Sequence, residues 1–136
     1  MARLVMLTVA LGAQESNGMI SMLSGFVESI QGPQLPIRNH LFGVARLHVE
    51  EAELGQPIVV VSRVEHADGE QVSRVELTIV AHAGPDYTGE LPHGVNLVFP
   101  LDLEFRREGL YRLSLTAAGE LLGEAPLRVA AQFPAM

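Results

Sequence analysis

The feature that most constrains this fold is a pair of alternating segments joined by a short turn, between Glu108 and Val129. From Tyr111 to Leu115 apolar and polar residues alternate, and this period of two places the apolar side chains on one face of a β-strand. Gly119 follows Ala118 and supplies the positive φ that a tight hairpin turn requires. The stretch therefore predicts two antiparallel strands.

The return strand of this hairpin keeps the same period. Its apolar residues stand at odd positions: Leu121, Ala125, Leu127 and Val129. Pro126 has no N–H to donate to a neighbouring strand, so it predicts an edge strand or a bulge at that point.

Similar patterns recur along the chain and predict six further strands. They are expected at 4–11, 19–30, 41–49, 58–65, 72–83 and 95–105, and the main loops at 14–18, 31–40, 50–57, 66–70 and 84–94. Strand 95–105 is the clearest, because one face carries only large apolar residues: Val95, Leu97, Phe99, Leu101, Leu103 and Phe105. We expect this face in the core, and Pro100 on the opposite face indicates an edge strand or a bulge.

About eight short strands separated by turn signals predict an all-β protein. The expected architecture is an antiparallel β-sandwich of immunoglobulin-like type, with residues 1–136 forming a single domain. A closed barrel is the alternative.

Composition excludes several classes of function. Cysteine is absent, so neither a disulfide nor a thiolate can contribute. The net charge is −7, and the nine basic residues are scattered arginines except for the pair Arg106-Arg107. An acidic chain without a basic stripe is not expected to bind nucleic acid or an anionic membrane. No apolar run approaches the ~18 residues of a membrane span.

The N-terminal stretch 4–11 is apolar on both faces and, after Arg3, is similar to a short signal peptide. The sequence Leu11-Gly12-Ala13 is a poor cleavage site because leucine occupies the first small position. We therefore expect a core strand, retention of residues 1–13 and a cytoplasmic protein.

The histidines do not form a metal-binding motif. The five are His40, His48, His66, His82 and His93. None stands two residues from another, and no H-E-x-x-H pattern occurs. His48 and His82 would approach only if strands 41–49 and 72–83 paired. We predict no metal ligand and no cofactor.

The remaining candidates for chemistry are equally weak. Ser24 and Ser62 lie inside predicted strands and outside any G-x-S-x-G motif. Asp102 and Glu104 share an outward strand face, where a solvated pair is expected. The acidic run 50–53 is typical of a solvated turn, and the glycines of 84–94 precede no helix that could bind phosphate. We predict no catalytic and no cofactor-binding residue.

Several blocks in combination resemble a bacterial family of small β-sandwich proteins classed as a domain of unknown function. The blocks are GMISMLSGFVESI at 18–30, the loop around Pro36, LFGVARLHVEEAELGQ at 41–56, HADGEQV at 66–72, VNLVFPLDLEF at 95–105 and the terminal hairpin. The likeness extends from about residue 14 to 130. Ala118 departs from it where aspartate is expected, and Ser24 where glycine or an apolar residue is common. The resemblance implies a β-sandwich and no assigned activity.

These observations favour a non-enzymatic protein-interaction or scaffold module whose loops 31–40 and 84–94 contact a partner protein. The alternative is a small-molecule-binding protein or hydrolase with a pocket between the sheets. Strands 4–11 and 58–64 are apolar on both faces, whereas a two-layer sandwich covers only one face of each sheet. Since large exposed apolar patches are unusual in monomers, we expect a homodimer, formed by sheet-face packing or through the first strand.

Overall fold

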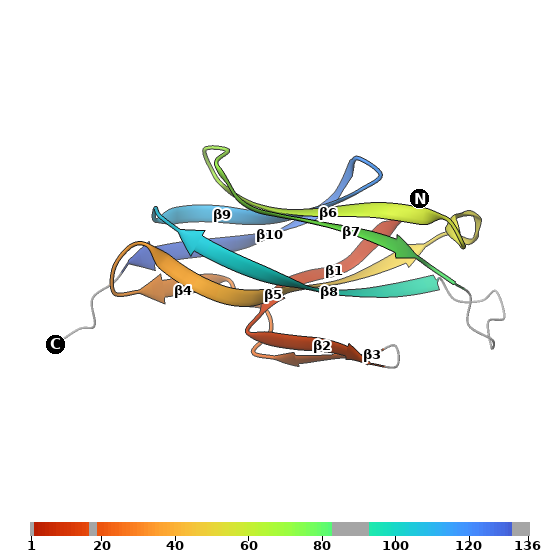
Figure 1. Ribbon diagram of the computed structural model, residues 1–136, viewed down its shortest axis with the longest axis horizontal. Helices are drawn as coiled ribbons and strands as arrows, with labels where there is room; N and C mark the ends of the chain where they lie inside the picture. Colours follow the sequence, from red (N-terminus) through yellow and green to blue (C-terminus); the bar gives the residue numbers. More distant parts are fainter. Residues whose placement is uncertain (1, 17–18, 83–92, 132–136) are drawn as a thin grey trace.

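The computed structural model describes residues 2–16, 19–82 and 93–131. They form two β-sheets packed face to face and a separate two-stranded hairpin (Figure 1). The predicted all-β, immunoglobulin-like sandwich is confirmed, although these residues contain ten strands rather than about eight. The additional strands come from the region between residues 12 and 32.

The bounds of the elements are as follows. The smaller sheet contains β1 (Arg3–Ala10), β5 (Ile37–Val49) and β8 (His93–Phe105). The larger sheet contains β4 (Ser29–Gly32), β6 (Pro57–His66), β7 (Gln71–Val80), β9 (Gly109–Ala117) and β10 (Glu120–Ala131). The hairpin contains β2 (Gly12–Ser16) and β3 (Met19–Leu23). The acidic run forms the 3₁₀ turn η1 (Glu51–Glu53). Over the described ranges, no helix has the length and apolarity of a membrane span.

The strand order is β1-β5-β8 in the smaller sheet and β4-β10-β9-β6-β7 in the larger one. Every neighbouring pair is antiparallel except β4 and β10, which run parallel, with Ser29 opposite Arg128. The predicted antiparallel sandwich thus contains one parallel pair, β4 with β10, that the sequence did not indicate. Sequence periodicity does not distinguish the two pairings, because both place alternate side chains on one face.

The core lies between the two sheets and is built from the alternating apolar residues of the central strands. Its largest fully buried side chains include Leu41, Leu47, Phe99, Leu101, Phe105, Tyr111, Leu113, Leu115 and Leu127. The inward set predicted on strand 95–105 is confirmed. Pro100 lies on β8, which is an edge strand of the smaller sheet.

The terminal hairpin has the predicted turn and an unpredicted bulge. Ala118 and Gly119 both have positive φ, 51° and 81°, which is the conformation of a type I′ turn. A bulge then interrupts the pairing of β10 with β9 between Leu121 and Gly123. Because a one-residue shift moves side chains to the other face, Leu121 is 58% exposed and Leu122 packs against the core instead.

Pro126 occupies a position in β10 that is locally an edge. The strand pairs with β9 over most of its length, but its pairing with β4 begins only at Arg128. At Pro126 the side of β10 away from β9 is therefore not part of a ladder, and the missing N–H costs no strand hydrogen bond.

The single strand expected at 19–30 is two strands with a break between them. Ser24 and Phe26 have positive φ, 51° and 58°, a conformation that non-glycine residues rarely adopt. The polar turn expected at 14–18 is in part strand, since Gln14 lies in β2, and its Asn17-Gly18 lies outside the described residues.

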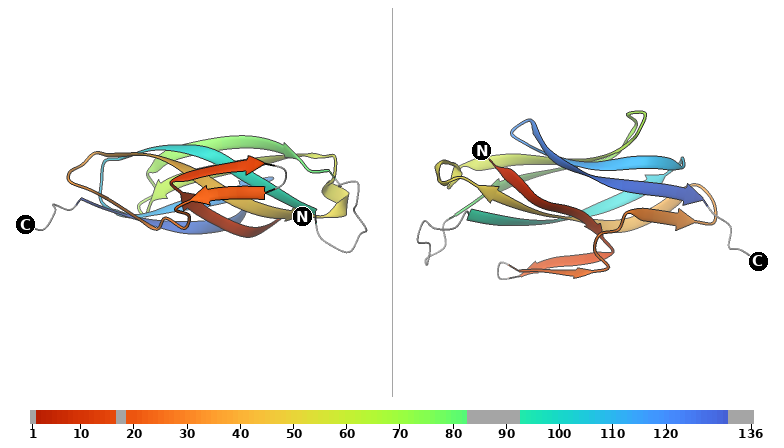
Figure 2. Two further views of the ribbon diagram at one scale, coloured as in Figure 1. Left: turned by 90° about the horizontal axis from the view of Figure 1, so that it is seen from below. Right: turned by 180° about the vertical axis from the view of Figure 1, so that it is seen from behind.

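The hairpin covers the outer face of the smaller sheet (Figure 2). Strand β2 contacts β5 and β8. Thr8, Ala10 and Val44 point to that outer side and are buried, although none belongs to the core between the sheets. Part of the apolar outer face is thus covered by the chain itself.

Candidate functional site

A buried tyrosine anchors the end of the sandwich where β8 turns into β9. The hydroxyl of Tyr111 donates a hydrogen bond of 2.7 Å to the main-chain oxygen of Arg107, four residues earlier. Its ring packs edge-on against Phe105 and His66, with centroids 4.8 and 4.9 Å apart. Burial raises the pKa of Tyr111. This arrangement is similar to the tyrosine corner of immunoglobulin-like sandwiches.

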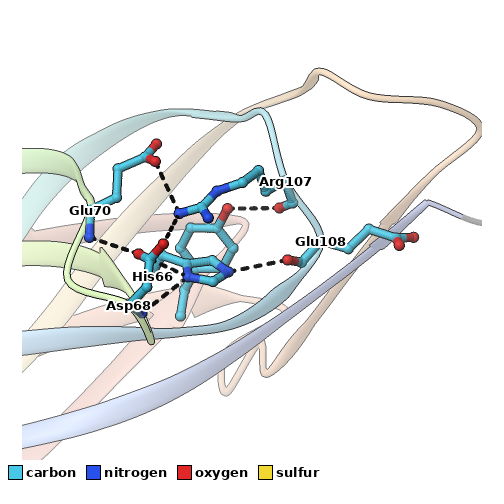
Figure 3. A network of polar contacts seen from close by, with 6 residues as sticks. His66, Asp68, Glu70, Arg107 and Glu108 are labelled. Atoms are coloured by element: carbon cyan, nitrogen blue, oxygen red, sulfur yellow. Dashed lines mark hydrogen bonds and ion pairs between the residues drawn. The ribbon is translucent and has the colours of Figure 1, made fainter.

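Charged side chains connect this corner to the β6–β7 turn (Figure 3). The Nη2 atom of Arg107 lies 2.6 Å from Oδ2 of Asp68 and 3.0 Å from Oε2 of Glu70. The main-chain N–H of Glu70 donates to Asp68, and together with the Arg107 guanidinium it lowers the pKa of Asp68 to about 2. The same ion pair raises the pKa of Arg107.

The ring nitrogens of His66 connect the β6–β7 turn to the β8–β9 turn. The N–H of Asp68 donates to Nδ1 at 3.1 Å, so in the neutral ring Nε2 carries the proton and donates it to the main-chain oxygen of Glu108 at 3.2 Å. Gly109 has a φ of 134°, and a Cβ there would lie 2.7 Å from Nε2. Each of the side chains His66, Asp68, Glu70, Arg107 and Tyr111 thus has a partner within the two turns, which indicates a role in holding them together.

A second set of charged residues projects outward from β5 and β8 near the same end. Across the strand pair, Arg38 contacts Glu104 at 3.4 Å. His40 pairs with Asp102, its direct neighbour in the register. Arg106 also approaches Glu104, at 3.7 Å. We call Arg38, His40, Asp102 and Glu104 the β5–β8 ladder.

The ladder borders a hollow of about 470 Å³ in the protein surface. Its lining consists of the ladder residues together with Asn39 and Leu103. The side chains of His40 and Asp102 are 62% and 82% exposed. The hollow is therefore an open surface on which charged groups meet solvent, and not an enclosed chamber between the sheets.

The histidines singled out in the sequence are dispersed. His48 accepts a hydrogen bond from Arg3, and burial followed by the positive charges of Arg46 and Arg3 lowers its pKa. Strands β5 and β7 belong to different sheets, so pairing does not bring His48 to His82. Within the described part of the chain, no group of three histidine or acidic side chains could hold a metal ion.

The two candidate serines are placed differently from each other. Ser62 is buried in the core, 2% exposed, and its hydroxyl has no hydrogen-bond partner in the structure. Ser24 is exposed in the break before β4. The acids Asp102 and Glu104, which the sequence predicted on one outward face, do lie there, and each has a basic partner on β5.

The two loops expected to contact a partner attach at opposite ends of the smaller sheet. Ile37, at the start of β5, is opposite Phe105, whereas Val49 is opposite His93 at the start of β8. At ~3.3 Å per residue, this ladder separates the two ends by roughly 40 Å. Residues 37–40 of the first loop are part of β5, and 84–92 of the second lie outside the described residues.

Sequence reasoning missed the cluster around Tyr111. It placed Tyr111 on the apolar face of a strand and 66–70 in a turn, but it did not connect them, because the contact joins residues about forty positions apart. The available signal was the tyrosine itself, two residues after the glycine that opens β9, which is the sequence context of a tyrosine corner.

Comparison with solved structures reveals similar folds at low sequence identity. The C-terminal domain of wzt matches with a TM-score of 0.50 and 13% identity, over 97% of this chain and 75% of that one. The alkylpurine DNA glycosylase AlkC of Pseudomonas fluorescens, bound to DNA containing an abasic site analogue, matches with a TM-score of 0.50 and 13% identity, over 96% of this chain but only 30% of that one. An immunoglobulin-like protein of Pseudomonas aeruginosa has a TM-score of 0.43 and 14% identity, over 96% and 97%. These likenesses concern the fold alone.

Comparison of the sequence with models of protein families identifies one matching family. No curated protein matches the sequence. Residues 5–130 match the model of DUF6941, a family of unknown function, and this range includes every strand from β2 to β9 and most of β1 and β10. The chain therefore belongs to the DUF6941 family.

Proposed function

We propose that this protein is a non-enzymatic interaction module that binds a partner protein through the β5–β8 ladder. The observation that carries the proposal is the open hollow of about 470 Å³ over two cross-strand polar pairs, Arg38–Glu104 and His40–Asp102. Strands hold these side chains at fixed spacing, so the ladder presents an ordered pattern of charge without needing a loop to become ordered on binding.

The chemistry of the ladder favours a peptide segment carrying charges of both signs. Arg38 and Arg106 supply positive charge, and Asp102 and Glu104 supply negative charge, side by side. Such a surface selects a partner by the positions of its charges. A polyanion is a poor ligand for it, since the chain as a whole carries a net charge of −7.

The residues that line the hollow support recognition over catalysis. The His40–Asp102 pair has the form of an acid–base pair, but its neighbours in the lining are Arg38, Asn39, Leu103 and Glu104, which carry no hydroxyl or thiol. Catalysis by a histidine-activated serine, threonine or cysteine needs such a group beside the histidine.

The alternative, a binding site for a small molecule, has one observation in its favour. An apolar hollow of about 240 Å³ lies at the other end of the sandwich, among residues that include Pro57, Ile58, Ala117 and Leu122. Ligand pockets usually measure ~300–1,000 Å³, so this one would suit only a small apolar molecule. Saturable binding of an apolar fluorescent probe that Leu122→Arg abolishes would favour this alternative.

Capture of partners from cells of the source organism, with the wild-type protein and two charge-reversal variants, tests the proposal. Asp102→Arg replaces the carboxylate that pairs with His40 by a guanidinium. Glu76→Arg makes the same change in the Arg74–Glu76 pair on β7, whose side chains are 44% and 52% exposed, and serves as the control. We expect Asp102→Arg alone to lose the partner, and a partner then made in pure form to bind this variant at least about tenfold more weakly. Equal recovery with both variants, each shown to be folded by circular dichroism, would contradict the proposal.

We also propose that the protein acts in the cytoplasm with residues 1–13 retained. The stretch that is similar to a signal peptide forms β1, where Val9 and Ala10 are buried, and removing it would leave β5 without a neighbour on one side. Mass spectrometry of native material should find a mature chain containing this strand. A mature N-terminus near Gln14 would contradict the proposal.

A further inference from the structure

Strand β3 presents an exposed, uncharged edge. It pairs with β2 on one side, and no other described strand pairs with it. Its sequence, MISML, contains no charge and no proline. Met19 is 68% exposed, Leu23 70% and Met22 39%. A two-stranded hairpin on its own is at best marginally stable in water, and a further strand would add to the support that β2 receives from β5 and β8.

Three of the four edge strands of the two sheets, β1, β7 and β8, are protected in ways that β3 is not. Proteins prevent unwanted strand pairing with charges or proline on edge strands. On β8 these are Pro100 and Asp102, and on β7 they are Arg74 and Glu76. The open side of β1 is partly covered by the segment before β4, since the N–H of Val27 donates to the main-chain oxygen of Val9 at 2.8 Å. The contrast indicates that the edge of β3 is left accessible for pairing.

The sequence of β3 is nearly symmetric about its centre, which identifies the partner strand. If two copies pair antiparallel about Ser21, Met19 lies opposite Leu23 of the partner subunit, and Ile20 lies opposite Met22 of the partner subunit. Ser21 then meets its own counterpart on the two-fold axis. Cross-strand apolar pairs of this kind stabilise a sheet, and a two-fold axis is the commonest symmetry of protein dimers.

We propose that the protein forms a two-fold dimer by antiparallel pairing of β3 with β3 of a second copy. The two hairpins join into one four-stranded sheet in the order β2-β3-β3-β2. The pairing brings the exposed methionines and leucines of each edge into contact. Leu11 and Phe26, 52% and 63% exposed at the root of the hairpin, lie close to where Met19 of the partner subunit arrives. This inference names β3, and not β1 or a sheet face, as the dimer contact, and it is independent of the β5–β8 ladder.

Charge substitutions on the proposed axis provide a direct test. Ser21 is exposed, so Ser21→Asp and Ser21→Lys leave the fold of one copy intact but place like charges opposite each other in the dimer. At a separation of ~5 Å this repulsion should weaken dimerisation by about tenfold or more. Gln14 is the cross-strand neighbour of Ser21 on the same face of the hairpin, and Gln14→Lys is the matched control. In the proposed dimer both copies of β3 lie between the two substituted residues 14, so their charges are much farther apart than those of two substituted residues 21.

Light scattering after size exclusion at micromolar concentration gives the readout. Wild type and Gln14→Lys should have twice the chain mass of 14.7 kDa, and each Ser21 variant alone should shift towards that monomer mass. An equimolar mixture of Ser21→Asp and Ser21→Lys should recover the dimer, because opposite charges then meet on the axis, and a variant that had merely lost its fold would not recover. A monomeric wild type, a dimer lost in Gln14→Lys but kept in the Ser21 variants, or a mixture that stays monomeric would each overturn the proposal.

Discussion

The hydroxyl of Tyr111 and the main-chain oxygen of Arg107 are joined by a hydrogen bond of 2.7 Å, which closes the β8–β9 turn from the inside. We expect Tyr111→Phe to lower the free energy of unfolding by about 1–2 kcal/mol, because it leaves the Arg107 oxygen without this donor. Urea denaturation measures the change. Thr116→Val is the control, since it removes a longer hydroxyl contact of 3.4 Å to Val61 and should have a smaller effect. Equal losses in both variants would contradict the role assigned to Tyr111.

Acidification should destabilise the protein partly through Asp68. Its pKa is lowered from 3.8 to about 2, so the stabilisation is present above about pH 4 and is lost as the pH falls towards 2. We expect Asp68→Asn to be less stable than the wild type at neutral pH and to lose less stability over this interval. Thermal unfolding followed from pH 5 to about pH 2 tests this.

The cause of this pKa shift can be separated into its parts. The hydrogen bond from the N–H of Glu70 is the largest single cause of the depression, and Arg107 acts through both a hydrogen bond and its charge, so Arg107→Gln should leave part of the depression in place. An NMR titration of Asp68 in this variant measures how much of the pKa depression remains. A return of the pKa to the usual value for aspartate would show that the ion pair, and not the main chain, is the main cause.

Ser62 offers a stabilising substitution. Its buried hydroxyl has no hydrogen-bond partner, and the desolvation of an unpaired polar group is unfavourable. Ser62→Ala should therefore raise the free energy of unfolding by about 1 kcal/mol, whereas Ser114→Ala, at a half-buried site on β9, should change it by less than ~0.5 kcal/mol. A lower stability for Ser62→Ala would mean that the hydroxyl is bonded in solution.

The turn between β9 and β10 carries a residue that is poorly suited to it. Ala118 has a φ of 51°, a conformation that asparagine tolerates better than alanine does. We expect Ala118→Asn to stabilise the protein by up to about 1 kcal/mol and Ala118→Val to destabilise it, since a β-branched residue is an outlier there. The melting temperatures of the two variants should therefore move in opposite directions from that of the wild type.

Local alternation predicted the strands whose two faces differ most. The inward residues of β8, from Leu97 to Phe105, are buried as expected, because a strict period of two is a direct consequence of strand geometry. The turn at Gly119 was equally visible, since few residues other than glycine suit its conformation.

Four features could not be read from the sequence because they depend on backbone conformation at non-glycine residues or on distant contacts. Ser24 and Phe26 adopt positive φ without being residues that favour it, which hid the break before β4. The bulge after Leu121 reversed the expected orientation of that side chain. The Tyr111 cluster and the β5–β8 ladder join residues that are far apart in the chain, so the sequence could place each member on a strand or turn but could not bring them together.

The parallel pairing of β4 with β10 has a consequence for how the protein is made. Ser29 pairs with Arg128, about a hundred residues later, and at ~5–20 residues per second a ribosome needs roughly 5–20 s to synthesise the chain between them. During that interval Ile30 cannot be buried against Val129, its partner in the finished sheet. The larger sheet is therefore completed late in translation, and a nascent chain that stops before residue 128 would expose an incomplete sandwich to chaperones and proteases.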